Sequence, residues 1–407
     1  MTDSLRRRVF WTATGLIALE GALFTLVIPA LPGFVDRYGL STSTAALMFA
    51  SFPIAQLGAA LAAAGPVERW GRRPVMVAAT LLLALATGGF ALADSALLLT
   101  AARTVQGLAA GLVWTAAVAA VSDIYPQEQL GYRIGLLETF GGSLALLGPV
   151  LGGVLISLIG VNATFGLAAI LPLLFIFPAL RIPETATRGR EPQPLLAALR
   201  RLAREPAAQA GAIALASAAA VLALLEPLLP IDLSDRLGLG AAAIGAVFAA
   251  GFAAFVLGAP IAGRWSDQHG RRPPILLGGL VIVVTLPFTA VGPAAVVAAA
   301  FFAVGLGVAT LAAPAAPLLT EAVDRAGMGG RYGISAAVLT VIFAAGYSLG
   351  PLIGAAASAV LPYSVIVAGL GVAVLACSVL AYRLLDPARR GDGAAASGGA
   401  LVIMPRG

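Results

Sequence analysis

Three ionisable residues, Glu20, Arg103 and Glu226, stand inside long apolar segments, where a charge is costly. Glu20 lies eleven residues from either end of the apolar segment 9–31. A carboxylate in hydrocarbon must be protonated, be paired with a cation or face water. A proton and a cationic solute would compete for such a group, so Glu20 is predicted to couple the movement of one to the other. The alternative is a protonated Glu20 that is hydrogen-bonded to a neighbouring helix.

Glu226 directly precedes Pro227, so local backbone groups are free to bind it. Three roles stay open: substrate recognition, closure of an outer gate through Arg103, and a structural acid with satisfied hydrogen bonds. Arg103 should face a polar cavity, since arginine in hydrocarbon costs at least about 2.5–3.5 kcal/mol; the alternative is a side chain that reaches the membrane surface. Phe24 shares a helical face with Glu20 and could stack on a cation, or simply pack.

The composition excludes most other chemistry. Hydrophobic residues make up 60% of the chain and charged residues 11%, so its solvent must be lipid. With one cysteine, Cys377, and one histidine, His269, we expect no disulfide within the chain, no metal site and no cofactor beyond a proton gradient. No cluster of nucleophile and base suggests an enzyme. The net charge of +6 follows membrane topology, so we expect no nucleic-acid partner.

The apolar residues fall into segments long enough to cross a bilayer, which takes roughly 20 residues as a helix. They are 9–31, 43–64, 74–92, 97–121, 134–157, 163–181, 209–231, 242–263, 274–292, 295–319, 333–357 and 362–384. We therefore expect an all-α membrane protein with 12 transmembrane helices, the first of them uncleaved.

All 25 basic residues are arginines, and their placement predicts the orientation. Only Arg37 and Arg236 fall in the loops on one side, while Arg103 falls inside a segment; the rest fall on the other side. Positive residues concentrate in cytoplasmic loops. Both termini are thus predicted to be cytoplasmic, in a multi-pass protein of a bacterial cytoplasmic (inner) membrane, and we expect a monomer.

The chain also repeats itself at an offset of about 199 residues. Gly71-Arg72-Arg73-Pro74 returns as Gly270-Arg271-Arg272-Pro273, and Gly148-Pro149 returns as Gly350-Pro351. A duplicated apolar chain predicts two pseudo-symmetric six-helix bundles around a central site. Glu20, Arg103 and Glu226 have no ionisable counterpart in the other copy. The functional residues are therefore predicted at the positions where the two copies differ.

This repeat divides the chain into four parts. They are an N-terminal half (1–181), a cytoplasmic linker with a short amphipathic helix (182–208), a C-terminal half (209–385) and a disordered cytoplasmic tail (386–407). Leucines at 195, 196, 199 and 202 share one face of the linker helix. That face either lies on the inner leaflet or packs across the two halves.

Two of the loops carry an acid beside a pair of arginines. The first reads Glu68-Arg69-Trp70-Gly71-Arg72-Arg73, and the second runs from Gly263 through Asp267 to Gly270-Arg271-Arg272. A carboxylate at a helix end can accept backbone N–H groups or pair with guanidinium groups. We expect these loops to latch the halves together on the inner face when the outer face is open; the alternative is a basic loop that only fixes topology. Asp123 and Glu138, near the ends of their segments, are expected to join this network or to be solvated helix ends.

These loops resemble the cytoplasmic signature of the major facilitator superfamily, G-x-x-x-D-R-x-G-R-R. The first copy departs from it at Ala64 and Glu68, and the second has Gln268 in place of the signature arginine. The resemblance implies the fold described above, with helices 1, 4, 7 and 10 lining a central cavity.

Other stretches are similar to further signatures of this superfamily. Arg103-Thr104-Val105-Gln106-Gly107 is similar to R-x-x-Q-G in the fourth helix. The segment Gly148-Pro149-Val150-Leu151-Gly152-Gly153, with a second copy from Gly346 to Gly350-Pro351, resembles the antiporter signature G-x-x-x-G-P-x-x-G-G. Small residues let helices approach and proline bends them. The resemblance implies a conformational role and exchange rather than symport; ordinary packing is the alternative.

The first and seventh segments look like those of the vesicular amine transporters. An acid, Glu20, precedes a run that ends in Pro29-Ala30-Leu31-Pro32, and Glu226 precedes Pro227-Leu228-Leu229-Pro230. That family has further acids late in its second half, whereas residues 332–385 contain none and Thr340 stands where one would be expected. The resemblance implies a drug:proton antiporter for a hydrophobic or amine-bearing molecule, with a proton symporter or a facilitator for a neutral solute as the alternative.

Overall fold

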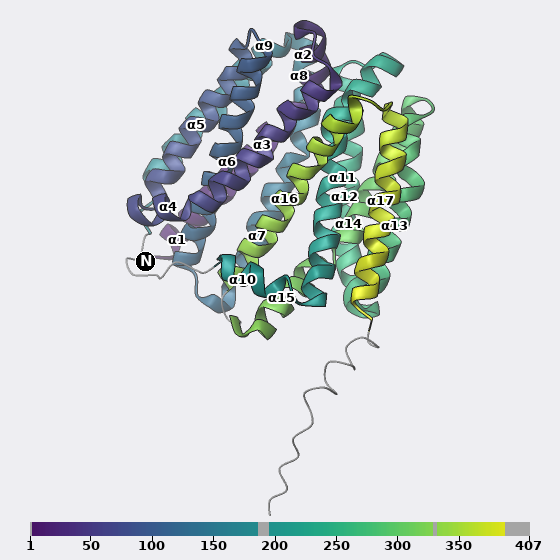
Figure 1. The fold of residues 1–407 in the computed structure, drawn as a ribbon. Coiled ribbons are helices and arrows are strands. Elements are labelled where there is room, and N and C mark those ends of the chain that lie inside the picture. The colour runs from purple at the N-terminus through teal and green to yellow at the C-terminus, as the bar shows by residue number, and fades with distance from the viewer. Residues whose placement is uncertain (1, 186–194, 329–331, 387–407) are drawn as a thin grey trace, which may run out of the picture.

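A computed structural model describes residues 2–185, 195–328 and 332–386, and helices form all of its regular structure (Figure 1). Twelve of the described stretches are long and apolar enough to cross a membrane, which confirms the expected number. The N-terminal half contains α1 (Asp3–Leu26), η1 (Ile28–Ala30), α2 (Leu31–Tyr38), α3 (Thr42–Ala62), α4 (Ala64–Trp70), α5 (Arg72–Leu92), α6 (Ala96–Ile124), α7 (Gln127–Ala145), α8 (Leu147–Ile159) and α9 (Val161–Arg181).

The C-terminal half repeats this arrangement after the linker helix α10 (Leu195–Leu202). Several helices extend beyond the predicted segments; the first stretch, for example, runs from Asp3 to Tyr38. The elements are α11 (Pro206–Leu237), α12 (Ala241–His269), α13 (Arg272–Thr285), η2 (Leu286–Ala290), α14 (Ala294–Ala312), α15 (Ala315–Val323), η3 (Asp324–Met328), α16 (Tyr332–Ser358) and α17 (Tyr363–Leu384).

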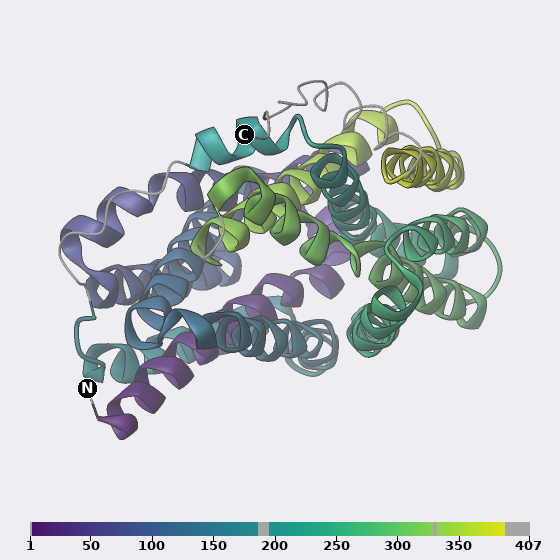
Figure 2. The same ribbon diagram turned by 90° about the horizontal axis from the view of Figure 1, so that it is seen from below.

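The bundle has two opposite faces, which differ in charge. We call the face at the bottom of Figure 1 the arginine-rich face, because it carries α10 and the loops that contain Arg72 and Arg271. The arginine-poor face, at the top of Figure 1, carries the C-terminal ends of α2 and α11, with Arg37 and Arg236. Figure 2 looks onto the arginine-rich face and shows the two halves side by side, the first in purple and blue and most of the second in teal and green.

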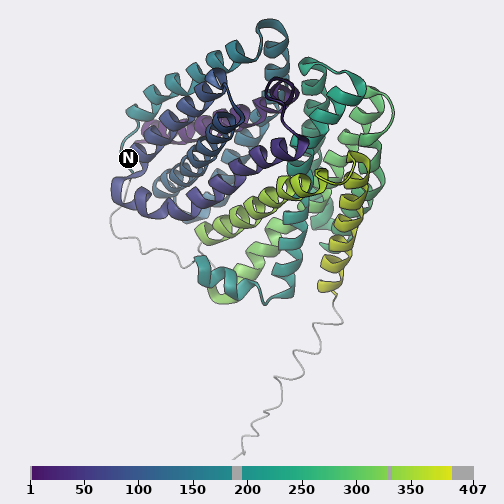
Figure 3. The same ribbon diagram turned by 45° about the horizontal axis from the view of Figure 1, so that its top comes forward.

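The halves contact each other near the arginine-poor face. Gly153 of α8 lies against the backbone of Ala241 at the start of α12, and Gly245 of α12 lies against the carbonyl of Pro149. The Ser43 hydroxyl of α3 donates a hydrogen bond of 2.7 Å to the Ala355 carbonyl of α16. Figure 3 shows α3 and α16 running side by side. The structure is therefore closed at this face.

The linker helix α10 packs on the C-terminal half. Ala198 and Leu202 are buried in one cluster with Leu319 and Ala322 of α15 and Val338 of α16. A face buried in this way is not free to lie on lipid. This favours packing over the inner-leaflet alternative, although the contact is with one half rather than across both.

Candidate functional site

The first transmembrane stretch is interrupted in its middle. Pro29 has no N–H to donate, and the N–H of Val27 turns to the carbonyl of Thr25, so that α1 ends at Leu26 and the 3-10 turn η1 follows. Donors from α6 occupy the carbonyls just before this break. Gln106 Nε2 donates to the Leu23 carbonyl at 3.2 Å, and Arg103 Nη1 donates to the Phe24 carbonyl at 3.1 Å.

Arg103 is fully buried at this break and does not reach the membrane surface. Its Nη1 also donates to Gln106 Oε1 at 2.8 Å, and Phe24, Phe49 and Phe52 surround the guanidinium, with ring centroids 4.5, 4.6 and 4.8 Å from Cζ. Cation–π contacts of this kind stabilise a desolvated cation. The predicted partner of Arg103 is therefore a set of carbonyl, amide and aromatic groups. Its Nε and Nη2 have no hydrogen-bond acceptor among the described residues.

Glu226 is buried in α11, and its partner comes from α16. The Tyr347 hydroxyl donates a hydrogen bond to Glu226 Oε1. Tyr347 was not among the residues predicted from the sequence. The signal that could have found it is a hydroxyl-bearing side chain between Gly346 and Gly350, inside the small-residue motif of an apolar helix.

Glu20 is partly exposed on α1. It forms no hydrogen bond or ion pair with the residues that the structure describes, so the alternative of a carboxyl bonded to a neighbouring helix finds no partner there. Its electrostatic neighbour is Arg103, which also interacts with Glu226 and Tyr347. The three predicted ionisable residues are therefore brought together.

Phe24 connects these groups across the two halves. Its ring lies 4.4 Å from that of Phe52 in the same half and 5.9 Å from that of Tyr347 in the other half, measured between centroids. The cation it contacts is Arg103. We call Glu20, Phe24, Arg103, Glu226 and Tyr347 the central cluster.

On the arginine-rich face, the first arginine loop forms a buried network. Arg72 Nε pairs with Asp123 Oδ2 at 2.7 Å, and both side chains are less than a tenth exposed. Glu184, which follows α9, accepts hydrogen bonds from the backbone N–H groups of Arg72 at 2.8 Å and Arg73 at 3.1 Å. Asp123 thus joins the network as expected, and Glu184 is an addition that the sequence motif did not reveal.

Glu68 and Arg69, by contrast, are exposed and make no ion pair with the described residues. Glu138 also lies apart from the network. It was expected near the start of its helix, but α7 begins at Gln127, so Glu138 lies three turns inside it on an exposed position. The expectation for Glu138 is corrected in this respect, because the helix extends farther towards its N-terminus than the apolar segment does.

The second arginine loop forms a more exposed network. Arg271 Nη1 lies 2.5 Å from Asp267 Oδ1, and Arg271 Nη2 lies 3.7 Å from Glu321 Oε1 on α15. Arg272 lies over the Tyr382 ring at 4.2 Å and pairs with Asp386 at 3.6 Å. In both loops, none of the pairings described here joins the N-terminal half to the C-terminal half. The predicted latch between the halves is therefore not formed by these pairs in this conformation, in which the opposite face is closed.

The predicted small-residue motifs are all sites of close helix packing. At each of these glycines, the backbone of a neighbouring helix occupies the space that a side chain would otherwise fill. Gly107 lies against Phe52, Gly148 against Ala22 and Thr25, Gly346 against Ala216, and Gly350 against Ala220 and Leu224. Pro149 and Pro351 lie in α8 and α16, beside these contacts. Gly263 has open space around it, and Gly270 likewise.

The part of the chain that the structure describes contains no group of three or more histidine, cysteine or acidic residues that could hold a metal ion. The central cluster combines two carboxyl groups, one guanidinium group and two aromatic side chains.

The sequence model of the Major Facilitator Superfamily matches residues 13–225 and 211–405. The chain is 31% identical over 170 residues to the multi-drug resistance efflux pump PmrA of Streptococcus pneumoniae. This aligned region covers 39% of this chain and 42% of that protein. The chain is also 33% identical over 172 residues to the multidrug resistance protein MdtG of Enterobacter lignolyticus, covering 41% of each. The chain thus spans about two fifths of the length of these relatives.

Solved structures agree on the fold. A bacterial homolog of the human lysosomal transporter Spinster, inward-facing and unoccupied, has a TM-score of 0.72 and 16% identity over 94% of this chain and 96% of that one. The efflux pumps among the relatives agree with the predicted drug:proton antiporter branch, while the likeness to vesicular amine transporters stays a prediction. With two matches of one family model that together cover nearly the whole chain, the expectation of a transporter-family protein rather than an enzyme is confirmed: the chain belongs to the Major Facilitator Superfamily.

Proposed function

We propose that this chain is a proton-coupled antiporter that exports a hydrophobic or cationic small molecule by alternating access. The observation that carries the proposal is the central cluster. Two acids from different halves, Glu20 and Glu226, share one arginine as their electrostatic neighbour. A membrane protein keeps buried ionisable groups at such cost mainly where they bind ions or protons.

Glu20 is the group that we propose to exchange proton and substrate. It is partly exposed and has no bonded partner among the described residues, whereas Glu226 is buried and bonded to Tyr347. A cationic substrate beside Glu20 favours its ionised form and so expels the proton; a returning proton neutralises Glu20 and weakens its hold on the substrate. Because the proton and the cationic substrate cannot both occupy Glu20, this one carboxylate is sufficient to couple the export of substrate to the entry of a proton.

The aromatic rings suit an apolar substrate or an organic cation. The rings of Phe24, Phe52 and Tyr347 lie in contact with one another across the two halves; Phe24 and Phe52 are buried and Tyr347 is partly exposed. Aromatic side chains stack on flat apolar groups and on organic cations. The relatives named as multidrug pumps support a substrate of this class.

The conformational step follows from the two faces. We infer that the arginine-rich face is cytoplasmic, since it carries most of the arginines, so the structure is closed on the outside. Opening the outer face would separate α8 from α12 and α3 from α16. The two arginine loops would then approach each other and form the predicted latch. The protein would act as a monomer in a bacterial cytoplasmic membrane.

The test is proton-driven exchange in proteoliposomes, with tetraphenylphosphonium as a lipophilic cation and an internal pH dye as readout. Wild-type protein is expected to release protons when the cation is added, and Glu20→Gln is expected to lose at least about nine tenths of this signal. Asp94→Asn, which removes an exposed acid in the loop between α5 and α6, is the control and should retain it.

Full exchange by Glu20→Gln would contradict the proposal. The sign of the pH gradient separates the alternatives, since an antiporter takes up the cation when the inside is acidic and a proton symporter when the outside is acidic. A flux that ignores the gradient would indicate a facilitator.

A further inference from the structure

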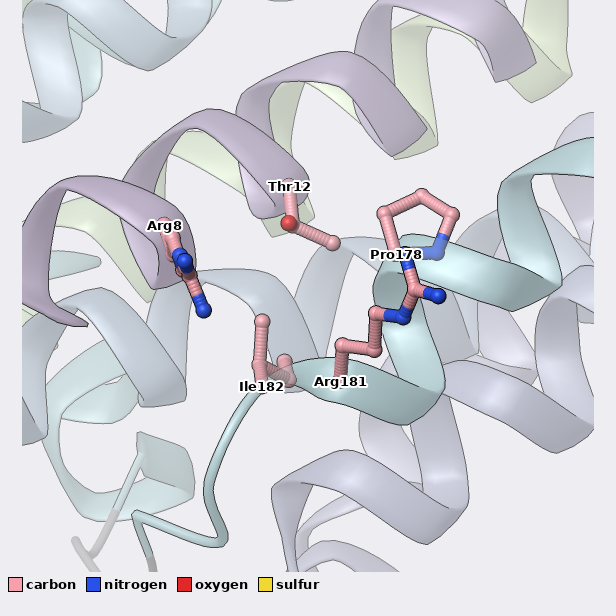
Figure 4. A pocket seen from close by; sticks show the side chains of 5 residues that line it. All are labelled: Arg8, Thr12, Pro178, Arg181 and Ile182. Atoms are coloured by element: carbon pink, nitrogen blue, oxygen red, sulfur yellow. The ribbon is translucent and has the colours of Figure 1, made fainter.

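A cavity lies at the arginine-rich end of the N-terminal half, between α1 and α9. Its volume is about 520 Å³, and Arg8, Thr12, Pro178, Arg181 and Ile182 line it (Figure 4). Figure 4 shows Arg8 on the α1 side and Arg181 on the α9 side. None of its residues belongs to the central cluster, and the transport mechanism proposed above does not use it.

This cavity carries positive charge that the described residues do not neutralise. Neither Arg8 nor Arg181 forms an ion pair or hydrogen bond with them. The acids nearest in sequence have other partners: Asp3 pairs with Arg6 at 3.7 Å, and Glu184 binds the backbone of Arg72 and Arg73. Two guanidinium groups on one cavity favour an anion, and their planar N–H groups suit a phosphate.

The cavity also borders an apolar surface. The Arg181 Cζ lies 5.0 Å from the centroid of the Phe177 ring, and Phe177 is 64% exposed. Leu174, one turn before Pro178 on α9, is 62% exposed. In a membrane-spanning helix these side chains face lipid. The cavity thus lies where a charged surface meets hydrocarbon, the depth at which phospholipid headgroups reside.

We propose that this cavity binds the phosphate headgroup of an anionic phospholipid, with Arg8 and Arg181 as ligands and an acyl chain along Leu174 and Phe177. A free phosphate ion would use the two arginines alone. The apolar stripe that continues from Arg181 favours a ligand that is anionic at one end and apolar at the other. Basic pockets between transmembrane helices recognise lipid headgroups in this way.

Binding of phosphatidylglycerol to purified full-length protein in a nonionic detergent tests the proposal, with native mass spectrometry and the thermal-unfolding midpoint as readouts. Each arginine near an anionic headgroup is expected to contribute about fivefold in affinity. Arg8→Gln/Arg181→Gln should therefore bind phosphatidylglycerol about 25-fold more weakly than wild type. Arg181→Lys, which keeps the charge but not the planar N–H groups, should bind less tightly than wild type and more tightly than the double variant, and its thermal-unfolding midpoint without lipid should match that of wild type.

The matched control is Arg200→Gln/Arg201→Gln, which removes two exposed arginines of α10 on the same face. It should bind the lipid like wild type. Equal loss in this control, or unchanged binding in the Arg8/Arg181 double variant, would overturn the proposal. Complete competition by inorganic phosphate at the same concentration as the lipid would also overturn it, because the cavity would then be a site for small anions. These readouts do not depend on transport, so they stand apart from the Glu20 test.

Discussion

The same proline motif has opposite effects in the two halves of the molecule. In the first half, Pro29-Ala30-Leu31-Pro32 ends α1 and produces the turn η1, whereas in the second half Pro227-Leu228-Leu229-Pro230 lies inside α11, which continues to Leu237. Proline removes a backbone donor in both places. What differs is the neighbouring helix. Arg103 and Gln106 of α6 bind the carbonyls before the first break, but their counterparts at the repeat offset in α14 are Phe302 and Gly305, which carry no donor.

Of these two proline motifs, the one that breaks its helix is therefore the one whose preceding carbonyls are bound by side-chain donors of a neighbouring helix. The two arginine loops also differ between the halves. Gly71 and Gly270 have matching conformations, with φ of 97° and 86°. Yet the first loop holds a buried ion pair between Arg72 and Asp123, and the second holds exposed ones around Arg271. Buried charged groups thus contribute more to the stability of the first half than to that of the second. Substitutions at matched positions of the two halves measure the difference in the free energy of unfolding.

The largest difference is expected at the two loop acids. Asp123→Asn leaves the Arg72 cation buried without its partner, which typically costs about 3–5 kcal/mol. Asp267→Asn removes an acid whose side chain is 66% exposed, and exposed pairs contribute at most about 1 kcal/mol. Reversible unfolding in detergent or in lipid measures both. Equal losses would show that the halves do not differ in this respect.

A smaller difference is expected at the helix break. Arg103→Gln removes the charged donor to the Phe24 carbonyl and should lower the free energy of unfolding by about 1.5–3 kcal/mol, the range of a hydrogen bond to a charged group. Phe302→Leu, at the equivalent position of α14, is the control; Phe302 is 40% exposed and should tolerate the change. Hydrogen exchange around Phe24 should speed up in Arg103→Gln alone. Unchanged exchange there would show that Arg103 does not hold the break.

The smallest difference is expected at the paired loop glycines. Both have positive φ, so alanine is strained at each by about 1–3 kcal/mol. At Gly71 the new methyl group would also meet the Glu184 carboxylate, whereas at Gly270 nothing lies within 4 Å. Gly71→Ala should thus cost about 1 kcal/mol more than Gly270→Ala, from the loss of one hydrogen bond at Glu184. Thermal unfolding of the two variants side by side gives the answer, and a reversed order would contradict the role of Glu184.

The number of spans and the two-half architecture could be predicted because lipid imposes simple demands. A helix must be long and apolar enough to cross, and duplicated motifs must occupy equivalent places. The grouping of Glu20, Arg103 and Glu226 could be anticipated for the same reason, since isolated charges in hydrocarbon need partners.

The individual partners could not be predicted, because they depend on packing between distant segments. Tyr347 reaches Glu226 from 121 residues away, and Glu184 reaches Arg72 from 112 residues away. Glu68 resembles the signature acid, yet it is exposed while Asp123 binds the arginine. Local spacing carries no information about which of several acids a folded loop will meet.

The contacts that close the arginine-poor face have a kinetic consequence. Gly153 against Ala241 and Gly245 against Pro149 are backbone surfaces with no side chain between them. Dispersion attraction falls steeply over the first ångström of separation, and there is no flexible side chain that could follow a retreating partner. Such a contact loses a large part of its attraction within about 1 Å of separation. The energy barrier between the closed and open forms should accordingly be narrow along the separation coordinate, so the arginine-poor face is expected to open in one step, without stable intermediate separations.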